Sequence, residues 1–101
     1  MSNYSKGANY ERAVKKELEK EGYSVIRSAG SHGIFDLVAW KSDKILFIQV
    51  KYLCKATKAD IEKLNQIIIP INGRKILWEK QDKNTVIKYE ITRDKCQAIT
   101  L

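Results

Sequence analysis

Four polar residues interrupt segments that are otherwise apolar, and their types could do chemistry. Glu11 lies on or at the edge of the apolar stripe of an expected helix, because it precedes the apolar positions 14 and 18 by three and seven residues. Asp36 interrupts an otherwise apolar run at residues 34–40. Gln49 and Lys51 end the next apolar run and share one face of it, because the side chains of a strand alternate.

The connection between the two apolar runs predicts how these residues meet. The short polar segment 41–44 indicates an antiparallel hairpin with a turn centred on residues 42 and 43. The numbers of paired residues then sum to 85, so Asp36 faces Gln49 and Lys51 lies one same-face step further. A shift of one residue would separate these side chains, so the predicted cluster depends on this turn.

Oxygen ligands from Asp36 and Gln49, with the Glu11 carboxylate nearby, suit a hard divalent cation such as Mg²⁺. The chemistry predicted is metal-assisted hydrolysis of a phosphodiester, in which the cation polarises the phosphoryl oxygen and lowers the pKa of its bound water. Lys51 would stabilise developing negative charge, or help to orient and deprotonate the attacking water. The alternative is a partly buried, structural ion pair of Asp36 with Lys51 or Arg27.

The elements that position these residues follow from hydrophobic periodicity and from capping signals. We expect a helix at residues 5–21, capped by Ser5 and ended by Gly22. A second helix is expected at 57–69, capped by Thr57, with positions 61, 64, 67 and 68 buried and Pro70 after it. Strands are expected at residues 23–27, 35–40, 45–51, 75–79 and 86–91. The order α-β-β-β-α-β-β predicts the α/β class, with a central mixed sheet flanked by helices.

Length and composition limit the classes of function. A chain of 101 residues is long enough for one domain, residues 1–101, and excludes a multidomain enzyme. No apolar run approaches the roughly 18–20 residues that span a bilayer, and the N-terminus lacks the apolar stretch of a secretory signal. We therefore expect an intracellular, cytoplasmic protein with no membrane partner. Cys54 and Cys96 have no metal-site or disulfide spacing and are expected to be free thiols.

Charge indicates the class of partner. The chain carries 19 Lys and Arg against 12 Asp and Glu, a formal net charge of +7, which favours a polyanion such as nucleic acid. The basic residues are spread along the chain, so a basic surface must be assembled by folding. A composition rich in Ile and Lys is compatible with an archaeal or viral source.

An ordered set of motifs resembles the PD-(D/E)XK nuclease superfamily and, within it, the archaeal-type Holliday junction resolvases. The resemblance covers residues 6–52, about half of the chain. It rests on five motifs, each weak alone: Lys6-Gly7 followed by Glu11-Arg12, Gly-Tyr-Ser-Val-Ile-Arg at 22–27, Arg-Ser-Ala-Gly-Ser-His-Gly at 27–33, Phe-Asp-Leu-Val-Ala at 35–39, and Gln-Val-Lys at 49–51.

The resemblance implies a homodimeric, Mg²⁺-dependent endonuclease that binds four-way DNA junctions and nicks two opposing strands, with Mn²⁺ as a substitute and no nucleotide cofactor. Glu11, Asp36 and Gln49 would take the metal positions, and Lys51 the position of the catalytic lysine. A two-fold dimer would also match a substrate with two equivalent cleavage points. The late β-rich region, with Ile76, Trp78, Ile87 and Ile91, is either its interface or part of the core.

The basic residues of the matched region complete the implied site. Arg12 and Arg27 match basic positions near the scissile phosphate, and Lys6 is a further DNA-binding position. The loop at 29–33 would supply the catalytic-site residue Ser31 and, with His32, a DNA contact, because its glycines let backbone N–H groups approach a phosphate; the alternative is a plain connecting loop. Lys55 and Lys58, just after the catalytic strand, are either phosphate contacts or ordinary solvated lysines.

Two departures from the family pattern affect the interpretation. Phe35 replaces the motif proline, which carries no chemistry. Gln49 replaces an acidic residue, and its neutral amide should lower metal affinity or remove a second metal. This leaves a non-catalytic DNA-binding module of the same fold as an alternative, beside a related nuclease acting on flaps, ends or single strands. A structural domain whose charge only keeps it in solution is the third class.

Overall fold

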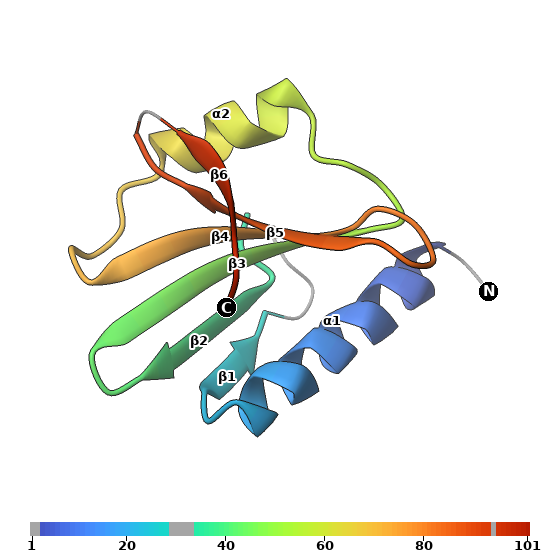
Figure 1. Ribbon diagram of the computed structural model, residues 1–101, viewed down its shortest axis with the longest axis horizontal. Helices are drawn as coiled ribbons and strands as arrows, with labels where there is room; N and C mark the ends of the chain where they lie inside the picture. The colour runs from blue at the N-terminus through green and yellow to red at the C-terminus, as the bar shows by residue number, and fades with distance from the viewer. Residues whose placement is uncertain (1–2, 29–33, 94) are drawn as a thin grey trace.

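The computed structural model describes residues 3–28, 34–93 and 95–101, and these residues form two helices and a six-stranded sheet. The elements follow in the order α1 (Asn3–Lys20), β1 (Ser24–Arg27), β2 (Leu37–Lys41), β3 (Lys44–Tyr52), α2 (Lys58–Gln66), β4 (Gly73–Lys80), β5 (Val86–Ile91) and β6 (Cys96–Ile99). The strands lie in sequence order across the sheet (Figure 1). Only β3 and β4 are parallel, with α2 between them in the chain, so the mixed sheet flanked by helices is confirmed.

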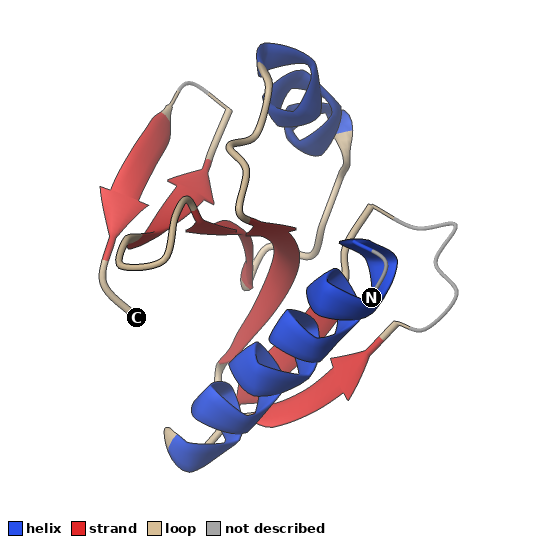
Figure 2. Ribbon diagram, turned by 90° about the vertical axis from the view of Figure 1, so that its right-hand side faces the viewer, coloured by secondary structure: helices blue, strands red, loops and turns tan. Residues whose placement is uncertain are grey.

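The core is divided by the sheet into two clusters. On one face, Val14 and Leu18 of α1 pack against Leu46 and Ile48 of β3. On the other face, Leu64 of α2 forms a buried cluster with strands β4 and β5. Figure 2 shows α1 lying across its face of the sheet, with α2 placed apart from it. Because β3 alternates between the two clusters, its even-numbered residues face α1 and its odd-numbered residues, Gln49 and Lys51 included, lie on the other face.

The register that the sequence predicts for the first hairpin is confirmed. Strands β2 and β3 pair from Lys41↔Lys44 to Leu37↔Ile48, and every pair sums to 85. Strand β2 nevertheless begins at Leu37, two residues later than predicted, so Asp36 precedes the strand. That difference determines how the carboxylate is held.

Helix boundaries were predicted less well than the register. Helix α1 begins at Asn3, so the prediction that Ser5 caps it is wrong. Helix α2 ends at Gln66, three residues early, and Ile68 is 97% exposed instead of buried. Pro70 disfavours a helical backbone at the residue before it, and Ile67 is already extended as the C-cap. Strand β6 was missed because the short segment 96–99 carries little apolar alternation.

The remaining expectations divide between core and surface. Ile76, Trp78 and Ile91 are buried, so the core interpretation of these candidates for a dimer interface is confirmed. Cys54 and Cys96 are free thiols, as predicted, and both are exposed. Among the residues that the structure describes, no helix has the length and apolarity to cross a membrane.

Two glycines of the α1 region should respond in opposite directions to alanine. Gly22 has φ +95°, so Gly22→Ala should lower the free energy of unfolding by about 1 kcal/mol through left-handed strain. Gly7 lies inside α1 and nothing else in the described chain is within 4 Å of a Cβ placed there, so Gly7→Ala should raise it by about 0.5–1 kcal/mol. Urea unfolding measures both; shifts of the same sign would contradict this account of α1.

Candidate active site

Asp36 is fixed where β2 meets the end of β3. Its backbone N–H donates to the Ile48 carbonyl at 2.8 Å, and its own carbonyl accepts from the Ser28 N–H at 2.8 Å. One carboxylate oxygen, Oδ2, accepts from the Val50 N–H at 2.8 Å. The predicted pairing placed the Asp36 side chain opposite that of Gln49. In the structure its carboxylate instead hydrogen-bonds to the backbone of β3 at Val50, one residue further along.

Glu11 and Arg27 form the neighbouring ion pair. Arg27 Nε donates to Glu11 Oε1 at 3.1 Å, and the two side chains are only 19% and 18% exposed. Helix α1 supplies the carboxylate and the edge strand β1 the guanidinium, so the contact spans 16 residues of sequence. Arg27 thus neutralises one of the two carboxylates expected to bind metal.

Burial acts on both carboxylates, and the charge of Asp36 acts on Glu11 as well. Burial raises the pKa of Glu11, and the negative charge of Asp36 raises it further, against the opposing charges of Arg27 and Arg12. Burial also raises the pKa of Asp36, opposed by the Val50 N–H and by the positive charges of Lys51 and Arg27. The pKa of each carboxylate therefore responds to charged groups from more than one element, as is common for titratable groups at functional sites.

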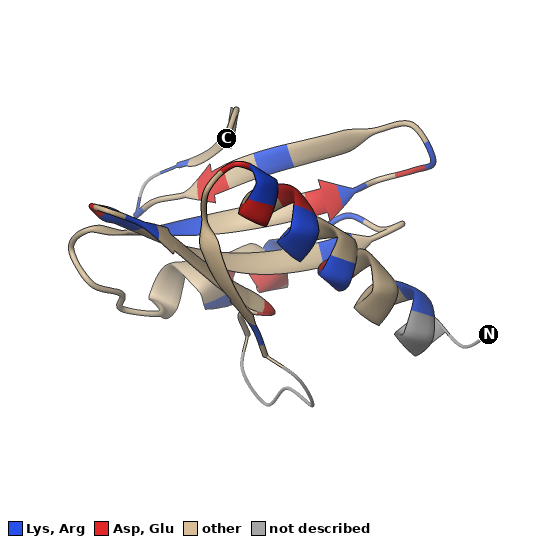
Figure 3. Cartoon of the chain, turned by 90° about the horizontal axis from the view of Figure 1, so that it is seen from below, with Lys and Arg blue, Asp and Glu red and all other residues tan. Residues whose placement is uncertain are grey.

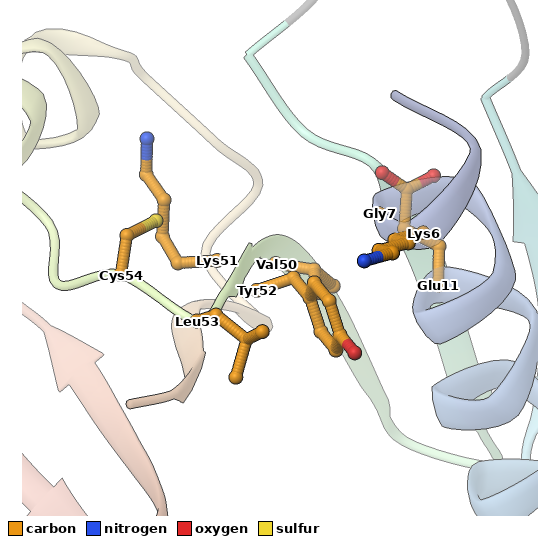
Figure 4. A pocket seen from close by; sticks show the side chains of 8 residues that line it. All are labelled: Lys6, Gly7, Glu11, Val50, Lys51, Tyr52, Leu53 and Cys54. Carbon is orange, nitrogen blue, oxygen red and sulfur yellow. The ribbon is translucent and has the colours of Figure 1, made fainter. Parts of the chain in front are cut away.

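Lys51 does not direct its ammonium at Asp36. Its Nζ lies 3.3 Å from Oδ2 of Asp60, in the first turn of α2. In Figure 4 the Lys51 side chain points away from Glu11, across the hollow between them. The described residues contain no ion pair of Asp36 with Lys51 or Arg27, so the structural alternative for Asp36 is not the arrangement observed.

The hollow between Glu11 and Lys51 has a volume of about 470 Å³. Beside these two residues it is lined by Lys6, Gly7, Val50, Tyr52, Leu53 and Cys54. Leu53 has φ +57°, an unusual backbone conformation for a bulky residue, and its N–H donates to the Lys80 carbonyl at 2.6 Å. Strain of this kind is often found at functional sites.

The surroundings of the Gln49 carboxamide show how well the candidate metal ligands fit a cation. Its Oε1 is buried and has no hydrogen-bond partner among the described residues. Leaving a buried acceptor unpaired costs about 1–3 kcal/mol of stability, and a cation bound by this oxygen would offset that cost. The described residues hold no cluster of three His, Cys, Asp or Glu ligands, and position 49 carries an amide. Glu11, Asp36 and Gln49 fit a hard cation as a set of two carboxylates and one amide oxygen.

Asp60 is the residue of this region that our sequence interpretation missed. The signal was present: Thr57 and Asp60 form a reciprocal capping box, with Asp60 N donating to Thr57 Oγ1 at 3.1 Å and Thr57 N donating to Asp60 Oδ2 at 2.8 Å. The capping residue was predicted, but its partner three positions later was not. Periodicity within β3 could not show that this carboxylate meets Lys51.

The basic residues predicted to bind DNA are spread over α1, β1 and the start of α2. Lys6 lines it, and Arg12 is exposed on α1 with a hydrogen bond to Asn9. Arg12 and Arg27 also line a second depression, of about 340 Å³, together with Lys15, Lys16 and Glu19. Lys55 and Lys58 are exposed on the α2 side. Figure 3 shows Lys and Arg recurring along α1. Ser31 and His32 lie outside the described residues.

Comparison with known proteins identifies the family. Residues 2–95 match the sequence model of the family described as archaeal Holliday junction resolvase (Hjc). The chain belongs to this family. The resemblance to PD-(D/E)XK nucleases is thereby confirmed.

Two members show how far the similarity extends. The crossover junction endodeoxyribonuclease Hjc of Methanocaldococcus jannaschii is 48% identical over 65 residues, which cover 60% of this chain and 48% of that protein. The chain therefore spans about half the length of this relative. The structure of Archaeoglobus fulgidus Hjc, a Holliday junction resolvase from an archaeal hyperthermophile, aligns with 85% of this chain and 73% of its own at a TM-score of 0.68 and 24% identity. That likeness confirms the Hjc nuclease fold.

The raised pKa of Asp36 predicts a stability gain when its charge is removed. Burial disfavours the ionised carboxylate in the folded state, so its charge costs stability at neutral pH, and the cost disappears as pH falls and the carboxyl protonates. Asp36→Asn keeps an acceptor for Val50 N–H and should raise the free energy of unfolding at pH 7 by up to about 1 kcal/mol. The gain should shrink toward about pH 4, near the ordinary pKa of Asp.

Urea unfolding at pH 7 and pH 4 measures this difference. Asp43→Asn, in the exposed hairpin turn, removes the same charge and should change stability little at either pH. A loss of stability in Asp36→Asn at pH 7 would show that the carboxylate charge is a net stabiliser of the fold.

Proposed function

We propose that this protein is a metal-dependent endonuclease that resolves four-way DNA junctions by paired nicks. Membership of the Hjc family supports the reaction, and one local observation carries it. The Asp36 carboxylate is fixed to the backbone of β3 one residue beyond Gln49, whose Oε1 has no hydrogen-bond partner in the described part of the chain. Two oxygen donors that no cation of residues 3–28, 34–93 or 95–101 pairs with suit a hydrolytic metal site.

The residues would divide the work as follows. Glu11, Asp36 and Gln49 would hold the metal, which when bound supplies Lewis acidity and a water of lowered pKa. Lys51 would stabilise negative charge that develops on the scissile phosphate. Arg27 would balance the Glu11 carboxylate and, with Arg12 and Lys6, orient the phosphate backbone. Ser31, His32, Lys55 and Lys58 stay predictions as further DNA contacts.

The proposal also covers the metal ion, the oligomeric state and the cellular location. The family is metal dependent, and Mg²⁺, with Mn²⁺ able to replace it, is the expected ion because the donors are all oxygen. A homodimer would place two sites on a two-fold junction, with residues 1–101 as the nuclease domain of each protomer. The reaction needs no nucleotide cofactor. A cytoplasmic location follows from the DNA substrate and belongs to the same proposal.

The reaction is tested by strand cleavage of an immobile four-way junction beside a linear duplex of the same arm sequences. We expect paired, symmetrical nicks on the junction in Mg²⁺ or Mn²⁺ and none in EDTA. Asp36→Ala and Lys51→Ala should reduce cleavage by about 100-fold or more while junction binding is retained. Cutting of flaps or single strands in preference to the junction would favour the related-nuclease alternative, and cleavage that survives Asp36→Ala would remove it from the metal site.

Gln49 decides between an active enzyme and a DNA-binding module of the same fold. Gln49→Glu restores a charge at the buried, unpartnered Oε1 and should lower the Mg²⁺ concentration needed for half-maximal cleavage by about 3–10-fold. Gln66→Glu, at the exposed end of α2, makes the same charge change outside the site and should leave it unaffected. If the wild type binds junctions without cutting and Gln49→Glu creates cleavage, the native chain is the binding module.

A further inference from the structure

Three carboxylates lie on or beside the elements next to Lys51 and could pair with its ammonium: Asp36, Glu79 and Asp60. Asp36 lies on the β2 side, where its Oδ2 accepts at 2.8 Å from the N–H of Val50, the residue before Lys51. Glu79 lies beside Lys51 in the parallel β3–β4 register and is 4% exposed. Its oxygens are already bonded to the Ala56 N–H at 2.7 Å and to Gln81 Nε2 at 2.8 Å. Asp60, from α2, is the group that Lys51 contacts.

The Asp60 carboxylate is fixed by hydrogen bonds that also favour its ionised form. Its Oδ2 accepts from Thr57 N at 2.8 Å, and its own N–H donates to Thr57 Oγ1. These bonds fix the carboxylate to the first turn of α2, and the Thr57 N–H lowers its pKa. The Lys51 and Asp60 side chains are 24% and 25% exposed, so the pair is only partly screened by solvent.

The contact of Lys51 with Asp60 matters because the candidate metal site has few carboxylates. Glu11 is already paired with Arg27, and position 49 carries a neutral amide. If Lys51 turned to Asp36, both carboxylates of the candidate metal site would be paired with cations of the protein. The lysine stem has four rotatable carbons, so only a competing partner keeps the ammonium elsewhere.

We propose that Asp60 is a positioning residue that holds the ammonium of Lys51 away from Asp36, so that the Asp36 carboxylate stays available to a divalent cation. The inference rests on the metal site of the proposed function and deepens it. It assigns α2, on the face of the sheet opposite α1, a part in metal binding although none of its residues is a ligand. In this chain Asp60 supplies, next to Lys51, a negative charge that Gln49 does not.

The test measures Mn²⁺ binding to the full chain without DNA, by the loss of the free-ion electron paramagnetic resonance signal. Asp60→Asn should weaken binding by about 3–10-fold, because the released ammonium competes at Asp36. In a Lys51→Met background the same change should alter binding by less than about 2-fold, since no ammonium is left to compete. Asp60→Glu keeps charge and capping box and should restore the wild-type affinity.

A second control separates the charge from the helix cap. Thr57→Ala removes the capping hydroxyl but keeps the Asp60 carboxylate, so it should lower stability without changing Mn²⁺ affinity more than about 2-fold. Equal affinities of Asp60→Asn and wild type, or an equal loss in the Lys51→Met background, would overturn the inference. If that happened while the wild type still cut junctions in Mn²⁺, the proposed function would stand alone; a wild type that binds no Mn²⁺ would overturn both.

Discussion

The hydrogen bond from the Val50 N–H to the Asp36 carboxylate is the contact on which the site depends. Strand β2 leaves its regular pairing at Leu37, so the backbone of β3 beyond Ile48 would have lost a partner on that side. The Asp36 side chain supplies the acceptor, at 2.8 Å. A buried N–H must be satisfied, and here the group that satisfies it is also the proposed metal ligand. The fold and the chemistry thus constrain the same carboxylate, which fixes its position more firmly than a rotamer preference could.

Around this point the protein separates its charges into pairs. Glu11 is bound to Arg27 on the α1 side, and Lys51 to Asp60 on the α2 side. Asp36 lies between these pairs with a backbone donor but no ion-pair partner among the described residues. Such a carboxylate is costly to bury, and its raised pKa expresses that cost. Proteins keep a cost of this kind where the group is needed for binding or catalysis. The Oε1 of Gln49, which no donor of the described residues reaches, is a second instance at the same place.

The sequence could predict whatever depends on period and on short-range turn geometry. The hairpin register, the apolar faces of α1 and the left-handed Gly22 follow from spacing alone. The start of β2 could not be predicted, because residues 34 and 35 are apolar enough for a strand, and only the structure shows that the Asp36 side chain bonds to the Val50 N–H. The pairing of Lys51 with Asp60 could not be predicted either, since it depends on where α2 lies across β3. Periodicity brings Glu11, Asp36, Gln49 and Lys51 to one region, but the partner of each depends on tertiary packing.

The position of the site at the end of β3 explains how so short a chain can build it. The side chains of a strand alternate between the two faces of a sheet, so α1 and α2 cannot both reach the same side of β3 along its length. At the strand's end the faces meet: Tyr52 packs on Tyr10 of α1 at a ring separation of 5.2 Å, while Lys51 reaches Asp60 of α2. Leu53 then takes φ +57° while its N–H binds the Lys80 carbonyl, which turns the chain from β3 toward α2. The turn at Leu53 therefore follows the two residues of β3 that contact α1 and α2, one on each face of the sheet.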